Sequence, residues 1–180
     1  MDSHLKNKID NISLIVSDVD GVLTDGSIFI GSDGTEFKQF NVEDGAGAAF
    51  ARLASIPIVL ISGRESKSTT IRARELKIEH CFQGSLDKIT PYNEVCDIYN
   101  VAPESIAYIG DGLIDIPVML KSGLAIAPEN AHVSVKEISD YVTEKKGGEG
   151  VLREVVELIL KGKDVYDTTL EQMKQKIYKV

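Results

Sequence analysis

Two aspartates separated by one residue follow a short apolar segment near the N-terminus. Residues 12–17 are apolar and partly β-branched, which predicts a buried strand, and Asp18-Val19-Asp20-Gly21 comes directly after them. In an extended segment residues i and i+2 face the same side, so Asp18 and Asp20 could address one ligand. Two carboxylates this close repel unless they share a hard cation such as Mg²⁺ or one carries a proton. The tetrapeptide alone fits a solvated turn equally well.

Polar residues also follow two further predicted strands. Ser62 and Arg64 come after Ile58–Ile61, and Asp111 and Asp115 come after Ile106–Ile109. Ligands of an open α/β sheet bind outside the carboxyl ends of its strands. In a phosphatase site Asp18 would bind Mg²⁺ and attack phosphorus, and Asp20 would act as general acid and base. The sequence therefore predicts that these strand ends converge on one metal and phosphate site.

The order of the predicted elements indicates how these side chains are positioned. Strand patterns alternate with helix patterns, which predicts one α/β domain over residues 1–180, with a Rossmann-like parallel sheet sandwiched by helices. A small β-hairpin insertion at about 24–41 takes the place of a cap domain, and a C-terminal tail covers about 162–180. Predicted strands are 12–17, 27–30, 36–40, 58–61, 106–109 and 124–127; predicted helices are 46–54, 68–77, 86–99, a segment ending at Leu120, and 151–160.

Composition and charge exclude several classes of partner. The formal net charge is -8, with 28 acidic and 20 basic residues, so a nucleic acid backbone would be repelled. No apolar run is long enough to span a bilayer, and the N-terminal residues lack a signal-peptide pattern. Cys81 and Cys96 form no CxxC motif and are expected to be reduced. These features favour a cytoplasmic protein without a membrane partner.

The longer motif Asp18-Val19-Asp20-Gly21-Val22-Leu23-Thr24-Asp25-Gly26 resembles motif I of the haloacid dehalogenase (HAD) superfamily. The resemblance implies a HAD-like fold and an aspartyl-phosphate intermediate on Asp18. Ser62 then matches the motif II hydroxyl, and Lys88 the motif III lysine that neutralises phosphate charge. Asp111 matches a direct Mg²⁺ ligand beside Asp18 and Asp20, and Asp115 an orienting residue behind the ligands. Individually, Ser62 could be a helix cap and Lys88 a solvated lysine.

Within that superfamily the chain resembles the capless 3-deoxy-D-manno-octulosonate 8-phosphate phosphatases, over about 12–160. The motifs are Phe40-Asn41-Val42-Glu43-Asp44-Gly45, Ile61-Ser62-Gly63-Arg64, Tyr108-Ile109-Gly110-Asp111 and Gly147-Gly148-Glu149-Gly150-Val151-Leu152-Arg153-Glu154. The resemblance implies a role in lipopolysaccharide biosynthesis and a homotetramer with active sites at subunit interfaces. The implied substrate contacts are Asp20, Asn41, Val42, Glu43, Asp44, Gly45, Arg64, Arg72 and Lys88.

Alternative interpretations stay open at this point. Arg64 and Arg72 could grip a sugar carboxylate with two hydrogen bonds each, or could form surface ion pairs with Glu65, Glu75 or a partner chain. The related phosphatases of nonulosonate (sialic-acid-type) 9-phosphates carry glutamate where this chain has Arg64, which favours the eight-carbon acid. A non-catalytic sugar-phosphate-binding module associated with a cytidylyltransferase is a further possibility.

The hairpin, the tail and two departures from the family pattern complete the predictions. In a monomer Ile28, Ile30, Phe37 and Phe40 would leave apolar surface exposed unless the hairpin folded onto its own core. Leu170, Met173 and Ile177 share one stripe of a helical tail that could pack on its own subunit or on a neighbour. Gly112 replaces an expected aspartate, and Ala49 an arginine, so one negative charge and one substrate contact are expected to be missing.

Overall fold

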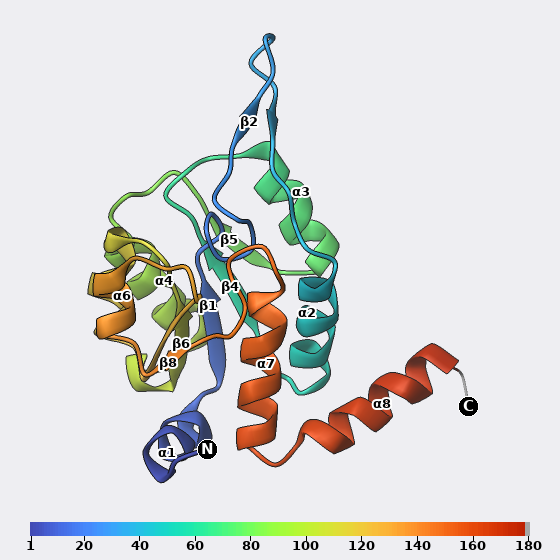
Figure 1. Cartoon of the computed structure of the whole chain (residues 1–180). Coiled ribbons are helices and arrows are strands. Elements are labelled where there is room, and N and C mark those ends of the chain that lie inside the picture. Colours follow the sequence, from blue (N-terminus) through green and yellow to red (C-terminus); the bar gives the residue numbers. More distant parts are fainter. Residues whose placement is uncertain (179–180) are drawn as a thin grey trace.

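A six-stranded parallel sheet forms the centre of the protein, as a computed structural model describes it for residues 1–178, with side chains to Lys176. The strand order is β5-β4-β1-β6-β7-β8, with β1 between β4 and β6. Figure 1 shows helices on both faces of this sheet. The strands are β1 (Leu14–Ser17), β4 (Ile58–Ile61), β5 (His80–Phe82), β6 (Ile106–Ile109), β7 (Leu124–Ala127) and β8 (Tyr141–Val142). The predicted α/β architecture is confirmed.

Alternating residues of the buried strands point to opposite faces of the sheet and pack into two hydrophobic clusters. On one face Ile15, Leu60 and Ile109 pack with α1 (Ser3–Asn11), α2 (Glu43–Leu53), α3 (Lys67–Leu76) and α7 (Val151–Gly162). On the other face Val16, Val59 and Tyr108 pack with α4 (Ile89–Tyr99), α5 (Ile116–Met119) and α6 (Val133–Glu137). Because both faces are covered, these strands are apolar throughout, as parallel strands usually are.

The predicted strands β1, β4, β6 and β7 are observed, whereas two edge strands were not predicted. β5 has three residues and β8 has two, too few for a periodic pattern to identify. The N-terminal helix α1 was also missed. Helix α2 begins at Glu43 instead of the predicted Ala46, with Glu43 and Asp44 in its first turn, where acidic side chains are favoured.

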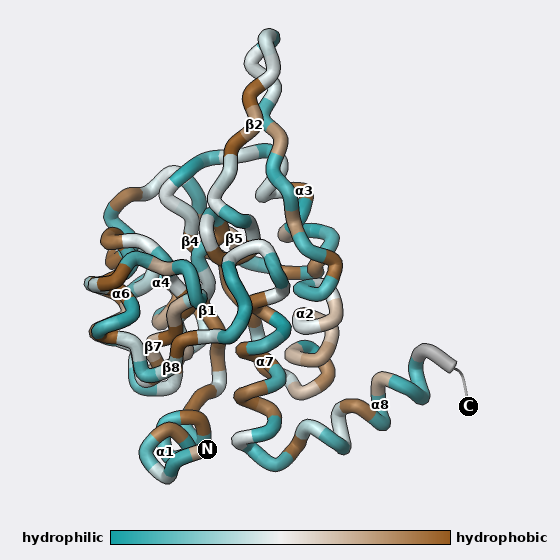
Figure 2. The backbone as a smooth tube through the Cα atoms, viewed as in Figure 1, coloured by the Kyte–Doolittle hydropathy of each residue, from teal (hydrophilic) through white to brown (hydrophobic). Residues whose placement is uncertain are grey.

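The hairpin projects from the end of the sheet where the strands terminate (Figure 1). Its strands β2 (Phe29–Ile30) and β3 (Glu36–Phe37) pair only with each other and are shorter than predicted. Phe29, Ile30 and Phe37 are exposed by 56%, 71% and 60%, so hydrophobic residues lie on the projecting arms (Figure 2). The prediction for Phe40 was wrong, because this ring packs against the core instead of adding to the exposed surface.

The C-terminal tail forms helix α8 (Tyr166–Tyr178), which starts on its own subunit and then extends away from it (Figure 1). Tyr166 stacks on Phe50 with ring centroids 5.8 Å apart, and Leu170 and Met173 pack against the core. The predicted stripe is therefore confirmed for these two residues, while the side chain of Ile177 lies outside the described part. No helix among the described residues is long and apolar enough to cross a membrane.

Candidate active site

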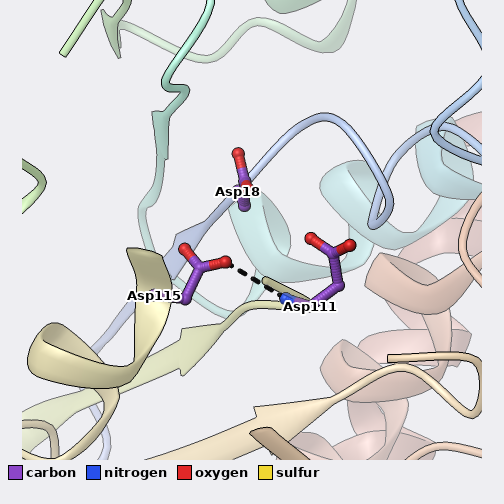
Figure 3. A group of neighbouring side chains, drawn as sticks. All are labelled: Asp18, Asp111 and Asp115. Carbon is purple, nitrogen blue, oxygen red and sulfur yellow. Dashed lines mark hydrogen bonds between the residues drawn. The ribbon is translucent and has the colours of Figure 1, made fainter. Parts of the chain in front are cut away.

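Three aspartates gather where the central strands of the sheet end. Asp18 follows β1, Asp111 follows β6, and Asp115 ends the short 3-10 turn η2 (Leu113–Asp115). Each offers a carboxylate oxygen, and these oxygens all lie within 4.8 Å of one another. Figure 3 shows the three side chains around a common space. The predicted convergence of strand ends is confirmed for this group.

Asp18 is held as a buried carboxylate with one strong cationic partner. Its Oδ1 accepts a hydrogen bond of 2.6 Å from Val19 N, and its Oδ2 lies 2.7 Å from Lys88 Nζ. Burial raises the pKa of Asp18 to about 7, although Lys88 lowers it in part. The site thus holds an anionic oxygen at a cost in solvation, which a bound cation would offset.

Lys88 bridges two carboxylates and is itself fully buried. Its Nζ donates to Asp115 Oδ1 at 2.6 Å, and Tyr108 OH donates to the same oxygen at 2.8 Å. Burial alone would lower the pKa of Lys88, but the negative charges of Asp18 and Asp115 outweigh it and raise that pKa. Lys88 is therefore an ammonium fixed beside Asp18, and the solvated-lysine interpretation is wrong.

Asp115 fits the predicted orienting role better than that of a direct ligand. Its second oxygen, Oδ2, accepts from Asp111 N at 3.2 Å and from Gly112 N at 3.0 Å. Together with Lys88 and Tyr108 these donors engage both oxygens of a side chain that is fully buried. Asp115 consequently fixes the loop that carries Asp111 and the ammonium that faces Asp18.

The donor set fits a hard divalent cation. Magnesium prefers a few carboxylate oxygens and keeps waters, and the buried Asp18 and the half-buried Asp111 offer such oxygens. Burial and the nearby Asp115 raise the pKa of Asp111 to about 6, although the charge of Lys88 lowers it in part. The absence of a side chain at Gly21 leaves space for the Asp111 carboxylate, because a Cβ there would lie 2.1 Å from Asp111 Oδ2.

Asp20 is held on the hairpin side of the site by a residue that the sequence did not single out. Lys38 Nζ lies 2.7 Å from Asp20 Oδ1 and 2.9 Å from Oδ2, and its side chain is fully buried. Asp20 does not belong to the group formed by Asp18, Asp111 and Asp115, and its contact with the metal stays a prediction. Lys38 lies within the strand-like run 36–40, which was interpreted only as part of a hairpin.

The predicted motif II residue, Ser62, and Arg64 follow β4, and Arg72 lies on α3. Ser62 is buried, and its hydroxyl donates to Arg64 O at 3.0 Å. Arg64 Nη2 donates to Glu36 Oε2 at 2.6 Å, and Arg72 donates to Asn41 O at 2.7 Å and to Glu75 at 3.1 Å. Both guanidinium groups therefore have intramolecular partners, Glu36 being one that the sequence did not suggest.

The segment 41–45 forms the start of α2 and contacts the loop after β8. Asn41 Nδ2 donates to Gly148 O at 2.9 Å, and Gly148 N donates to Val22 O at 3.0 Å in the loop after Asp18. Val42 is 81% exposed, and Glu43 pairs with Arg153. Gly45 is half-buried in the first turn of the helix. This segment borders the active-site loop through main-chain and amide contacts.

The Asp44 side chain points away from the site, contrary to the expected substrate contact. It is 1% exposed, and its Oδ1 accepts from Leu152 N at 3.1 Å in the first turn of α7. Asp44 therefore joins α2 to the N-terminus of α7, where a carboxylate satisfies free backbone N–H groups. Any substrate contact of segment 41–45 would have to come from its other members.

Asp44 should make stability pH-dependent. Burial raises its pKa from the ordinary 3.8 to about 6, with backbone N–H groups of Arg153 and Leu152 offsetting part of the rise. Between pH 3.8 and about 6 the folded protein keeps a proton on Asp44 that the unfolded chain has lost. The contribution of Asp44 to the free energy of unfolding is therefore complete below pH 3.8 and is lost as the pH rises through about 6.

We therefore expect the Asp44→Asn variant to gain stability relative to the parent between pH 4 and pH 7, by roughly 1–3 kcal/mol. Urea unfolding of both proteins across this range measures the difference. The same series on Asp97→Asn, at an exposed position of α4, gives the control. Parallel stability curves for Asp44→Asn and its parent would contradict the assignment.

Two residues depart from the pattern of the resembling family without disturbing the fold. A Cβ at Gly112 would meet only Asp115 Oδ2 at 3.7 Å, so a larger residue would fit there. Ala49 lines a cavity of about 290 Å³ together with Arg52, Leu53, Gln172, Met173 and Lys176, between α2 and α8. Neither position carries a contact to Asp18, Lys88 or Asp111 among the described hydrogen bonds.

Comparisons with known proteins agree with this geometry. Residues 65–155 match the model of the haloacid dehalogenase-like hydrolase family. The chain is 44% identical over 153 residues to the 3-deoxy-D-manno-octulosonate 8-phosphate phosphatase of Escherichia coli (strain K12), covering 85% of this chain and 81% of that protein. It is 45% identical over 154 residues to the Yersinia pestis phosphatase of the same name, covering 86% and 82%.

Solved structures give the same result. The crystal structure of the Yersinia pestis phosphatase superimposes with a TM-score of 0.90 at 42% identity, covering 92% of this chain and 89% of that one. The Moraxella catarrhalis phosphatase, solved with a magnesium ion, a phosphate ion and a KDO molecule, gives a TM-score of 0.92 at 37% identity, covering 96% and 99%. This chain therefore belongs to the haloacid dehalogenase-like hydrolases, in the family of the 3-deoxy-D-manno-octulosonate 8-phosphate phosphatases.

Proposed function

We propose that this protein is a Mg²⁺-dependent phosphatase that hydrolyses 3-deoxy-D-manno-octulosonate 8-phosphate to the free sugar acid and phosphate. One observation carries the proposal: Lys88 Nζ lies 2.7 Å from Asp18 Oδ2 and 2.6 Å from Asp115 Oδ1, in a chain that is 43–45% identical to phosphatases of this substrate. A buried ammonium next to a carboxylate nucleophile suits a transferring phosphoryl group, which carries negative charge.

The reaction follows from the side chains at the strand ends. An oxygen of Asp18 forms a bond to phosphorus as the ester P–O bond breaks, and Asp20 gives a proton to the leaving sugar oxygen. Water then attacks phosphorus, Asp20 takes its proton, and Asp18 is released. Lys88 and the hydroxyl of Ser62 would bind phosphoryl oxygens. Mg²⁺ held by Asp18 and Asp111 would neutralise charge on the phosphate.

Recognition of the sugar acid is proposed to involve Arg64 and Arg72. Planar guanidinium groups suit the carboxylate of a 2-keto acid, which they can bind with two hydrogen bonds. Arg64 has an exposed side chain, and its partner Glu36 could be exchanged for the substrate carboxylate. Arg72 is only 17% exposed and is held by Asn41 O, which supports a role in shaping the edge of the site formed by segment 41–45.

Phosphate release from a panel of sugar phosphates tests the function. We expect turnover only with Mg²⁺ present, and kcat/KM for the octulosonate 8-phosphate at least about tenfold above that for a nonulosonate 9-phosphate, since one extra substrate group is commonly worth that much. The reverse order would assign the nonulosonate substrate. Absence of Mg²⁺-dependent turnover on every compound would indicate a binding module associated with a cytidylyltransferase.

We also propose that the protein is a homotetramer in which hairpins cover neighbouring active sites. The support is the exposed apolar surface of Phe29, Ile30 and Phe37 on a sheet that, among the described residues, consists of two strands. Light scattering during size-exclusion chromatography should give four times the chain mass, and Ile30→Lys should reduce the mass and the activity together. A monomeric parent with full activity would overturn this proposal.

A cytoplasmic location is the remaining proposal. Cys81 and Cys96 are free thiols, as expected in a reducing compartment.

A further inference from the structure

The hairpin reaches the active site through one buried cation. Lys38, the residue after β3, extends its side chain under the hairpin to the loop after β1, where its Nζ contacts both carboxylate oxygens of Asp20 at 2.7 and 2.9 Å. The same Nζ lies 3.3 Å from Thr69 Oγ1 on α3 and 3.8 Å from Glu36 Oε1. Lys38 therefore joins three separate segments at a single point.

The environment of Lys38 makes this contact specific. The Lys38 side chain is fully buried and Thr69 is 0% exposed, whereas the Asp20 side chain keeps 21% of its surface accessible. A buried ammonium is retained only where it is paired and hydrogen-bonded, so Lys38 needs Asp20 as much as it restrains Asp20. The accessible edge of Asp20 stays available to the reacting groups.

The hairpin side of the contact is also anchored. Glu36 Oε2 accepts from Arg64 Nη2 at 2.6 Å, and Ser68 Oγ donates to Glu36 O at 3.3 Å. These bonds fix the returning arm of the hairpin on the start of α3, which determines where Lys38 begins. The orientation of Asp20 therefore depends on how the hairpin arm with Glu36 and Lys38 docks on the start of α3.

We infer that Lys38 is a positioning residue for Asp20, and that the hairpin is needed for leaving-group protonation. The inference rests on the proposed function, in which Asp20 gives its proton to the leaving sugar oxygen. Without Lys38 the Asp20 carboxylate would lose the ammonium that contacts both of its oxygens and could rotate away from the leaving group. Bond making by Asp18 at phosphorus would not depend on Lys38 directly, because Lys88 serves that residue.

Substrates with different leaving groups can distinguish protonation by Asp20 from bond formation by Asp18. An alkoxide of the sugar needs a proton as the ester bond breaks, whereas p-nitrophenolate is stable enough to leave without one. The comparison uses kcat/KM, which reports the steps up to formation of the phospho-enzyme and excludes the later attack of water. The proteins are the parent, Asp20→Asn, Lys38→Met, Lys38→Arg and, as control, Lys67→Met at an exposed position of α3.

We expect Lys38→Met to lower kcat/KM for the sugar phosphate by about 10²-fold and for p-nitrophenyl phosphate by less than about tenfold, the same pattern as Asp20→Asn. Lys38→Arg should recover part of the lost activity, and Lys67→Met should match the parent. Equal losses on both substrates, or no loss, would overturn the inference while leaving the function intact. Thermal melting and Mg²⁺ titration accompany each variant, and Thr69→Val provides a milder change if Lys38→Met fails to fold.

A parent enzyme that hydrolyses neither substrate would overturn the proposed function and this inference together. Activity of the parent on both substrates, with an unchanged substrate ratio in Lys38→Met, would remove only the role of Lys38. The two failures are therefore distinguishable in one set of measurements.

Discussion

Replacing Lys88 by methionine is expected to destabilise the protein by about 3–5 kcal/mol and to lower turnover by about 10²-fold or more. The change leaves the carboxylates of Asp18 and Asp115 buried without the cation that now lies within 2.7 Å of both. It also removes the donor proposed for the phosphoryl oxygens. Urea unfolding measures the loss of stability, and phosphate release at saturating substrate measures the loss of turnover.

The pH dependence of Lys88→Met identifies the cause of the loss. Without Lys88 the pKa of Asp18 should rise further above its present value of about 7, because the lysine is what lowers it now. The variant should therefore lose least stability near pH 5, where the carboxyl can be protonated, and most near pH 8. Lys121→Met, at an exposed position, is the matched control. A uniform, small loss at all pH values would contradict the buried network.

Asp18→Asn should abolish turnover, by at least about 10⁴-fold, without a matching loss of stability. Asparagine fills nearly the same volume and has no carboxylate oxygen able to form the phospho-enzyme. Burial already raises the pKa of Asp18 to about 7, even with Lys88 beside it, so the ionised carboxylate costs stability when Mg²⁺ is not bound. Phosphate release and thermal melting without Mg²⁺ measure the two effects.

The control for this pair of measurements is Asp97→Asn, an identical change at an exposed carboxylate on α4. It should leave both turnover and melting unchanged. An active Asp18→Asn protein would remove Asp18 as the nucleophile. A strongly destabilised one would show that Asp18 supports the fold rather than the chemistry.

The strand ends could be predicted because elementary rules govern them. Apolar runs of β-branched residues identify buried parallel strands, and their carboxyl ends share one edge of the sheet. Asp18 and Asp111 were placed at one site on this ground, and Lys88 was added by the resemblance to motif III of the family. The structure adds Tyr108, which looked like an ordinary core residue but donates a hydrogen bond to Asp115.

Contacts across the insertion could not be predicted in this way. The meeting of Lys38 with Asp20 depends on how the hairpin docks on α3, and no local pattern encodes that docking. The substrate contact of Asp44 was expected from the family resemblance, which does not show where this side chain points. In the structure Asp44 lies in the first turn of α2 and accepts a hydrogen bond from Leu152 N of α7.

The most direct test of the account is to trap the phosphorylated enzyme. The protein is mixed with 3-deoxy-D-manno-octulosonate 8-phosphate and Mg²⁺, quenched during turnover, treated with borohydride, and mapped by peptide mass spectrometry. An acyl phosphate is reduced to an alcohol under these conditions, so the account predicts homoserine in place of the aspartate at position 18 and no change at Asp20 or Asp111. Reduction at another carboxylate, or none during steady turnover, would contradict it.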